Sequence, residues 1–227
     1  MPLTERDRIA TALARGLAGY LQHQLALNAG DNLSELHLQF VDAQILERAL
    51  PSKPVYVNKT PEQWKDSRGG QSDKTLDLAS GNQRAWRYIA EMKYIPVAKT
   101  VLTTVREAVV QDAARLATVP LAVTDAETNT GRFLVLCCRA QMRQRLLGRY
   151  DTGMTGLLRG LLSVEKQTPD GKADRATLQT EFKAWQDRTP KGWKLSGRAG
   201  LKASLILIEE FRDGTTGSGE VGIWHCG

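Results

Sequence analysis

The chain contains few cysteines, and their spacing indicates no covalent or metal-binding framework. Only three occur in 227 residues, with Cys137 and Cys138 adjacent and no CxxC pair. A disulfide-stapled secreted fold and a zinc site of the CxxC type are therefore excluded, and a reducing compartment is expected. Cys137 and Cys138 are interpreted as buried core residues, while His225 with Cys226 offers only two ligands for a metal.

Long apolar runs and a signal peptide are also missing. No stretch reaches the roughly 18 to 20 apolar residues that would cross a bilayer, so we expect a cytoplasmic protein without a membrane role. The three histidines, His23, His37 and His225, have no positioned serine or cysteine partner, which argues against a nucleophilic triad. Walker and dinucleotide glycine patterns, internal repeats and low-complexity tracts are absent too.

The residues that are present indicate an ordinary globular domain with a basic balance. Hydrophobic residues make up 41% and charged residues 25% of the sequence, and 227 residues suffice for one full core. Lysine and arginine number 31 against 25 acidic residues, which gives a net charge of +6. An anionic partner such as nucleic acid is compatible with this charge, although many basic proteins bind none.

Two helices are expected before the first strand. Apolar residues that recur mostly at every fourth position predict a helix over residues 4–27, capped by Thr4, which could pack on the core or on a second subunit. A second helix is expected from a cap at Asp31, Asn32 or Ser34 to about Leu50. Its predicted inward-facing residues are Leu36, Phe40, Val41 and Ile45.

The rest of the chain mixes strand and helix signals. Helical patterns occupy residues 101–119, 141–162 and 175–186. The β-prone runs predict a strand at 54–58, a hairpin over 75–96, a strand buried on both faces at 132–140 and a closing hairpin at 201–211 and 219–226. This order indicates a mixed α/β fold around one central sheet.

The hairpin at residues 75–96 carries charges where its strands are otherwise apolar. Glu91 and Lys93 are two apart and share one face of a strand, and Asp77 stands between two leucines on the other strand. A charge in a buried strand costs several kcal/mol unless it is paired or bound to a metal. A salt-bridge cluster at a half-exposed sheet edge is one explanation, and a metal-dependent active site is the other.

The order of these elements resembles the core of the PD-(D/E)XK nuclease superfamily, which has the restriction-endonuclease-like fold. The matching features are a helix, a hairpin with LDL on one strand and Glu-x-Lys on the next, a helix and an apolar strand. The segment QDAARL at residues 111–116 is also similar to the helix that follows the Glu-x-Lys strand in many members. Other acid-x-lysine pairs, at 170–172 and 181–183, lie in an expected turn and an expected helix.

The resemblance covers about residues 33–140 and implies a restriction-endonuclease-like central mixed sheet flanked by helices. Additional C-terminal helices and a terminal β-hairpin complete the expected α/β fold. We therefore expect a single nuclease-like domain over residues 1–227. It divides into an N-terminal accessory helix at 1–32, the core at 33–140, and C-terminal helices with a β-hairpin at 141–227.

The resemblance also implies a Mg²⁺ site, with Mn²⁺ as a substitute. Asp77 and Glu91 would hold the metal through carboxylate oxygens, with the main-chain carbonyl of Met92 as a further ligand. The metal would polarise the phosphate and lower the pKa of a bound water. Lys93 would orient that water or stabilise the developing negative charge.

Two further residues are assigned to the site by position. Glu35 is the best match for the acid that the family's first core helix often contributes, and its alternative role is to complement the helix dipole. Gln111 would contact the site from the following helix. The family's proline before the first acid is replaced here by Leu76.

The implied activity is hydrolysis of DNA phosphodiester bonds by a metal-dependent nuclease, with restriction, phage defence or repair as its setting. The alternative is a catalytically inactive module of this fold that binds nucleic acid or scaffolds a protein complex. A homodimer or a partner subunit is a further expectation by family analogy. The expected nucleic-acid contacts, which would otherwise be a solvated helix face and an ordinary loop, are Arg139, Arg143, Lys191, Trp193 and Lys194.

Overall fold

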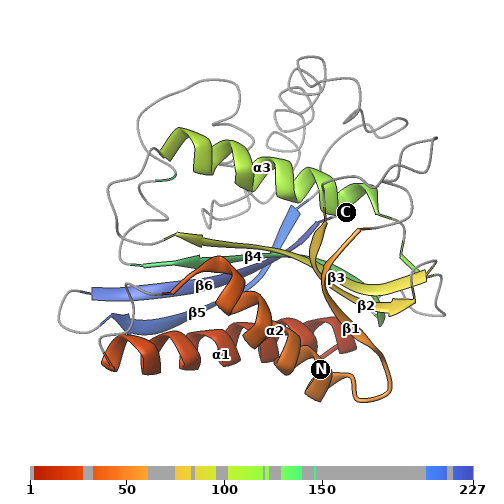
Figure 1. Ribbon diagram of the computed structural model, residues 1–227, viewed down its shortest axis with the longest axis horizontal. Coiled ribbons are helices and arrows are strands. Elements are labelled where there is room, and N and C mark those ends of the chain that lie inside the picture. The colour runs from red at the N-terminus through yellow and green to blue at the C-terminus, as the bar shows by residue number, and fades with distance from the viewer. Residues whose placement is uncertain are drawn as a thin grey trace.

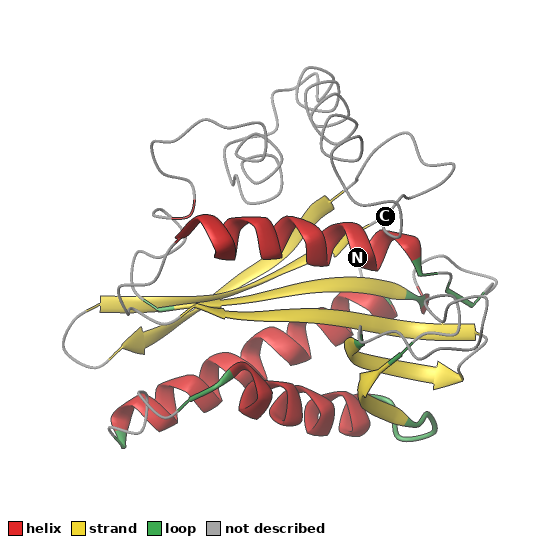
Figure 2. Cartoon of the chain, turned by 45° about the horizontal axis from the view of Figure 1, so that its top comes forward, coloured by secondary structure: helices red, strands yellow, loops and turns green. Residues whose placement is uncertain are grey.

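A six-stranded mixed sheet lies between helices on its two faces. The helix α3 (Leu102–Thr118) covers one face, while α1 (Glu5–Ala26) and α2 (Glu35–Ala49) cover the other (Figure 1). The tilted view shows the same three layers (Figure 2). The computed structural model describes residues 3–27, 33–60, 75–82, 85–95, 102–119, 121–122, 129–139, 146, 203–213 and 217–226.

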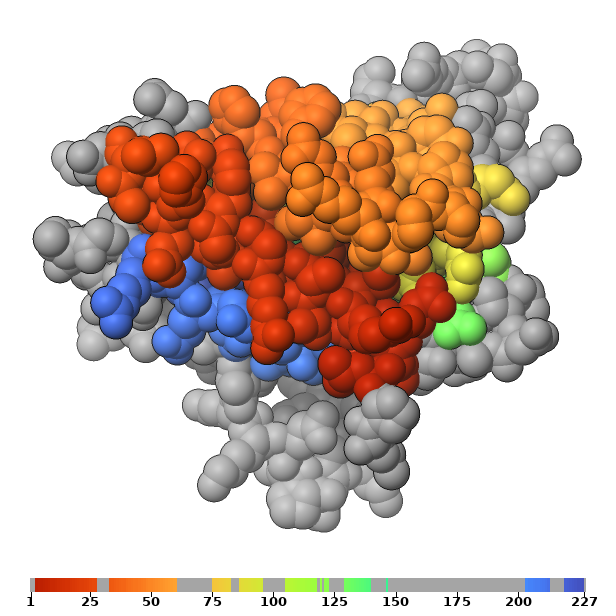
Figure 3. All heavy atoms as spheres, turned by 90° about the horizontal axis from the view of Figure 1, so that it is seen from below, coloured from red at the N-terminus to blue at the C-terminus, as the bar shows by residue number. Residues whose placement is uncertain are grey.

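The two N-terminal helices begin at the caps that the sequence predicts. Thr4 Oγ1 accepts the Asp7 N–H at 3.1 Å at the start of α1, and Ser34 Oγ accepts the His37 N–H at the start of α2. The helix α1 buries its leucine and alanine stripe against the sheet and α2, and the two helices lie side by side on one face of the molecule (Figure 3).

The inward face of α2 matches the prediction only in part, since Val41 and Ile45 are half-buried and pack against the core. Leu36 and Phe40, expected in the core, are 48% and 53% exposed. The helix instead buries Leu38, Gln39, Asp42, Ala43 and Leu46. Because two of these five residues are polar, the apolar pattern of this helix does not mark the face that packs on the sheet. The polar residues therefore approach the charged strands, which the next subsection describes.

Four of the five strand pairings in the sheet are antiparallel. The strand order is β1-β2-β3-β4-β6-β5, and only β3 and β4 run parallel. The helix α3 lies between these two in the chain, as a parallel crossover requires. The expected mixed α/β architecture is thus confirmed. The strands are β1 (Val55–Lys59), β2 (Leu76–Asn82), β3 (Ala85–Ile95), β4 (Gly131–Cys138), β5 (Ala203–Asp213) and β6 (Gly217–Cys226).

The closing hairpin extends the central sheet instead of standing apart from it. Its second strand, β6, pairs with β4, and β5 forms the edge beyond it. As a result β4 is covered on both faces and flanked on both sides, and seven of its eight residues, all except Arg132, are buried. The prediction of a strand buried on both faces is confirmed.

Alternate residues of β3 pack into two separate cores. Tyr88 and Met92 pack with α1 and α2, while Ile89 and Ile95 pack with α3. Glu91 and Lys93 share the parity of the isoleucines and therefore face α3. Their neighbours on β4 are Leu134 and Leu136. Two charges thus stand in an apolar surface, where they need partners.

Some expected features fall outside the part of the chain that is described. The predicted helices at 141–162 and 175–186 lie outside the described residues, apart from residue 146. All three cysteines are free and buried, as the sequence analysis expected for Cys137 and Cys138. None of the described helices combines the length and the apolar character that crossing a bilayer would require.

Candidate active site

Where β2 and β3 separate, the side chain of Asp77 takes the place of a backbone carbonyl as hydrogen-bond acceptor for a β3 amide. The ladder between these strands reaches Leu78, which pairs with Ala90. One residue further, the Asp77 carboxylate takes over, and its Oδ2 accepts the Met92 N–H at 2.6 Å. The hydrogen bond satisfies the backbone N–H of Met92 and also fixes the Asp77 carboxylate beside β3. This junction is the geometric centre of the candidate site.

Lys93 lies between two carboxylates from the helices on opposite faces of the sheet. Its Nζ is 3.0 Å from Glu35 Oε1 of α2 and 3.3 Å from Asp112 Oδ2 of α3. The Glu35 carboxylate also accepts the Tyr94 N–H through Oε2, at 3.3 Å. Glu35 therefore reaches the sheet from the first turn of α2, where the helix dipole also favours a negative charge. Its two expected roles are compatible in this geometry.

Glu91 has a cationic partner that the sequence analysis did not assign to the site. Arg115 Nη2 of α3 lies 3.3 Å from Glu91 Oε2 and also pairs with Asp112 Oδ1. Glu91 is only 1% exposed, and its other oxygen, Oε1, has no hydrogen-bond partner among the described residues. One side of this buried carboxylate is thus neutralised, and the neighbouring charge of Asp77 also acts on it.

Burial and like charges raise the pKa of both hairpin acids. For Asp77, burial is the largest cause and raises its pKa to about 6, against the lowering effect of the Met92 N–H. Glu35 and Asp112 add to the increase, and Lys93 opposes it. Burial likewise raises the pKa of Glu91 well above its usual range, with Asp77 as the next cause. Both acids therefore hold protons more tightly than free carboxyl groups.

A third acid, Asp42, approaches the same place from α2. It is fully buried, and neither carboxylate oxygen has a hydrogen-bond partner in the described part of the chain. Burial first, and the charge of Asp77 second, raise the pKa of Asp42 well above its usual value. One turn earlier, Gln39 is also buried and its Oε1 is also without a partner. Gln39 and Asp42 are thus the two polar residues on the buried face of α2.

The two cations of the cluster are held in their charged forms by these acids. Burial by itself lowers the pKa of Lys93, but Asp112, Glu35 and Asp77 together raise it above its ordinary value. Burial also lowers the pKa of Arg115, and Glu91 and Asp112 outweigh it. Five carboxyl groups thus surround two cations. If all ionised, the cluster would carry three uncompensated negative charges at a largely buried position.

The structure brings together four of the five residues assigned to catalysis from the sequence. These are Glu35, Asp77, Glu91 and Lys93. The fifth, Gln111, is exposed, and its neighbour Asp112 takes the buried place beside Lys93. Adjacent residues on a helix point about 100° apart, so only one of the two can face the sheet.

Three members of the cluster received no site role from the sequence. Asp112 and Arg115 lie in the QDAARL segment three residues apart, a spacing that places both on one helix face. The apolar stripe of α3 could have identified that face, because Val109, Ala113 and Leu116 are buried beside them. Asp42 had no such signal, since its helix shows apolar residues on the exposed side as well.

The predicted nucleic-acid contacts are largely outside the described residues. Arg143, Lys191, Trp193 and Lys194 belong to segments that the structure does not describe. Arg139 is described, directly after β4, where it is half-buried and its backbone N–H donates to Ile95 O at 3.1 Å. Its proposed contact with nucleic acid therefore stays a prediction.

The carboxylates do not form a ready-made metal cage within the described part of the chain. No three His, Cys, Asp or Glu side chains there are arranged to hold an ion. The donors nevertheless suit a hard divalent cation, which prefers carboxylate and carbonyl oxygens. Glu91 Oε1 is without a partner, and the excess negative charge of the cluster calls for a cation or for protons.

Comparison of the chain with protein-family models, with curated proteins and with solved structures gave no match in any of the three searches.

Proposed function

We propose that the protein is a divalent-metal-dependent nuclease of the PD-(D/E)XK type that hydrolyses phosphodiester bonds of DNA. The observation that carries the proposal is the convergence of Asp77, Glu91 and Lys93 where β2 and β3 separate, with carboxylate in excess over cation. A purely structural salt-bridge cluster would favour matched charges, because unpaired buried charge is costly. An excess of buried acids is instead expected where a metal or protons complete the site.

The residues divide between holding a metal and acting on the substrate. Asp77 and Glu91 would hold Mg²⁺ or Mn²⁺, with the Met92 carbonyl as a further ligand. When bound, the metal would supply a Lewis acid for the phosphate and a water of lowered pKa. The raised pKa of Asp77 and Glu91 supports this assignment, because a cation would release their protons and relieve their mutual repulsion.

Lys93 is proposed to act on the reacting phosphate. Its amine is held by Glu35 and Asp112, and these carboxylates raise its pKa, so it remains an ammonium group at neutral pH. A fixed positive charge stabilises the negative charge that develops on phosphoryl oxygens, and it can orient the attacking water through a hydrogen bond. Glu35 and Asp112 are thus positioning residues in this mechanism.

The test is DNA cleavage with matched variants. Plasmid and linear DNA are incubated with the protein and Mg²⁺ or Mn²⁺, with EDTA as the metal-free control. We expect metal-dependent cleavage that Lys93→Ala abolishes, while Lys59→Ala, which changes a lysine on β1 outside the cluster, retains it. Circular dichroism establishes that both variants are folded. Equal cleavage by the two variants would contradict the assignment of Lys93.

A second candidate function is a non-catalytic module that binds nucleic acid or scaffolds a complex. The ion pair between Arg115 and Glu91 favours it, because a cation already occupies one side of the carboxylate that a metal would need. This alternative predicts salt-sensitive DNA binding without turnover. It also predicts that Mn²⁺ titrated into the wild-type protein and into Glu91→Gln gives the same calorimetric signal, whereas the nuclease requires saturable binding that the variant loses.

A further inference from the structure

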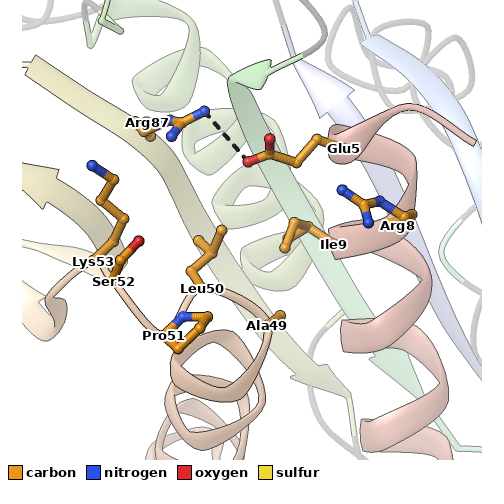
Figure 4. A pocket seen from close by; sticks show the side chains of 9 residues that line it. All are labelled: Glu5, Arg8, Ile9, Ala49, Leu50, Pro51, Ser52, Lys53 and Arg87. Carbon is orange, nitrogen blue, oxygen red and sulfur yellow. Dashed lines mark hydrogen bonds and ion pairs between the residues drawn. The ribbon is translucent and has the colours of Figure 1, made fainter.

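A pocket of about 460 Å³ lies near the start of β3, at the opposite end of this strand from the acidic cluster. Three cations line it, and they are kept apart. Arg87 pairs with Glu5 at 3.4 Å, while Arg8 and Lys53 stand on opposite sides of the pocket with apolar side chains between them (Figure 4). No carboxylate among the described residues bridges two of these cations.

At the other end of β3, a single carboxylate holds two cations. Asp112 Oδ2 lies 3.3 Å from Lys93 Nζ, and Asp112 Oδ1 pairs with Arg115 Nη2. On the outer sides, Lys93 Nζ is 3.0 Å from Glu35 Oε1, and Arg115 Nη2 is 3.3 Å from Glu91 Oε2. Three acids and two cations thus alternate in a row from α2 across β3 to α3. The row fixes an ammonium group and a guanidinium group next to one shared carboxylate.

The two cations are among the accessible members of this row. The side chains of Lys93 and Arg115 are 21% and 19% exposed, whereas those of Asp112 and Glu91 are 4% and 1% exposed. Glu35 is 33% exposed, but its carboxylate is paired with Lys93. An anion that approaches the row therefore meets two cations and one paired carboxylate, even though acids outnumber cations in the cluster as a whole.

Arg115 has one contact that anchors it and one that it can exchange. Asp112 lies three residues earlier on the same helix, so this ion pair keeps the guanidinium beside the sheet when the contact with Glu91 is broken. Glu91 is the carboxylate that the proposed nuclease uses to hold a metal, and a divalent cation there would replace Arg115 as its neutralising partner. The released side of the guanidinium has the planar fork that matches two phosphate oxygens.

We infer that Arg115 is a second phosphate-binding residue of this site, which leaves Glu91 when a metal is held there and donates hydrogen bonds to the reacting phosphate beside Lys93. Because this role rests on the proposed nuclease function, it assigns a further residue of that site. It also accounts for the ion pair between Arg115 and Glu91. The same guanidinium neutralises the buried carboxylate before metal binding and the phosphate afterwards.

The test measures two properties of Arg115→Gln. Single-turnover cleavage of linear duplex DNA at saturating Mn²⁺ should fall about 10²-fold, as for the loss of one donor to a developing oxyanion. Calorimetric titration with Mn²⁺, without DNA, should show binding about tenfold tighter, because the competing cation is gone. Arg48→Gln, which changes an exposed arginine of α2, is the matched control and should equal the wild type in both measurements.

A second variant, Arg115→Lys, keeps a positive charge beside Glu91 and Asp112 and so preserves the fold if the glutamine variant does not. Its cleavage rate should lie about tenfold below that of the wild type, because an ammonium group cannot form the paired hydrogen bonds of a guanidinium group. Circular dichroism establishes that each variant is folded. Cleavage by Arg115→Lys at the wild-type rate would overturn the inferred contact with the phosphate.

Opposite changes in cleavage and in Mn²⁺ affinity support the inference, because a purely structural role of Arg115 would weaken both. Weakening of both in a folded Arg115→Gln would therefore overturn it. Unchanged or faster cleavage together with tighter Mn²⁺ binding would also overturn it, and would leave Arg115 only as a competitor of the metal. Absence of cleavage by the wild-type protein would instead overturn the nuclease function itself, and the role of Arg115 with it.

Discussion

The two ends of β3 differ in how their charges are arranged. At Arg87 the pocket is open, and two of its three cations, Arg8 and Lys53, have no ion-pair partner among the described residues. At Glu91, four residues or about 13 Å further along an extended strand, the acids are buried and outnumber the cations. The helix α2 joins the two ends, since Glu35 begins it and Leu50 caps it. Exposure explains the difference: water screens the unpaired cations, whereas the buried acids need protons or a bound cation.

The largest expected effect is on catalysis at the acidic end. Asp77→Asn keeps an oxygen that can accept the Met92 N–H, so the fold should remain, but it weakens a proposed metal ligand. We expect DNA cleavage to fall at least about 10³-fold, measured as plasmid nicking under single-turnover conditions. Glu107→Gln, an exposed acid on α3, serves as the control. Cleavage within a few-fold of the wild type would remove Asp77 from the active site.

The second effect is a pH dependence that only the acidic end should show. Asp77 has a pKa of about 6 when folded, against an ordinary value of 3.8, so the folded state binds its proton more tightly than the unfolded state. In the folded state the protonated form is favoured below about pH 6, and the free energy of unfolding falls as pH rises from about 4 to about 6, by about 3 kcal/mol in total.

This pH effect is measured by urea denaturation of the wild type and Asp77→Asn in EDTA, at a series of pH values. The variant cannot ionise at this position, so its free energy of unfolding should exceed that of the wild type by an amount that grows between about pH 4 and pH 6 and stays constant above about pH 6. A difference between the two proteins that does not change with pH would show that Asp77 titrates normally.

A third, smaller effect concerns Arg115. Replacing it with glutamine removes the cation beside Glu91 and Asp112, so the cluster becomes more negative and should bind Mg²⁺ about tenfold more tightly. The increase in Tm on adding Mg²⁺ should therefore be larger for Arg115→Gln than for the wild type. Arg48→Gln, on the exposed side of α2, should respond like the wild type. An equal increase in all three proteins would indicate that Arg115 does not compete with the metal.

The smallest effect tests the rotation of α2, which places Glu35 at one end of β3. Phe40→Ala should change the free energy of unfolding by less than about 0.5 kcal/mol, because the side chain is 53% exposed. Leu38→Ala, on the buried face, should cost about 2 to 4 kcal/mol. Thermal and urea denaturation measure both. The reverse order would mean that the helix packs through the face that its apolar pattern predicted.

The sequence predicted the strands better than the helix faces. Alternating and continuous apolar runs identify β2, β3 and β4, because sheet residues bury by a simple period of two. The face of α2 was predicted only in part: Val41 and Ile45 pack against the core, but Gln39 and Asp42 occupy buried positions that hydrophobic periodicity assigns to apolar residues. The burial of polar residues at such positions is explained by neighbours outside the helix, and here the charged cluster near the end of β3 is that neighbour.

The sequence predicts the strand residues of the candidate site better than its helix residues. Glu91 and Lys93 are recognisable from their spacing in a strand that follows another acid-bearing strand. Asp112 and Arg115 share the helix face of the buried Val109, Ala113 and Leu116, so the apolar stripe of α3 could have identified them. The pocket at Arg8 and Lys53 joins residues 45 positions apart through the packing of α1 against the end of α2, and no local pattern predicts such a contact.

The hydrogen bond from the Met92 N–H to the Asp77 carboxylate has a consequence for spectroscopy. This amide is protected by an ionisable side chain instead of a strand, so its exchange with deuterium and its proton chemical shift should follow the state of that carboxylate. Protonation of Asp77, or its coordination by Mg²⁺, withdraws electron density from the acceptor. One backbone resonance can therefore report occupancy of the acidic end without any substrate or cleavage.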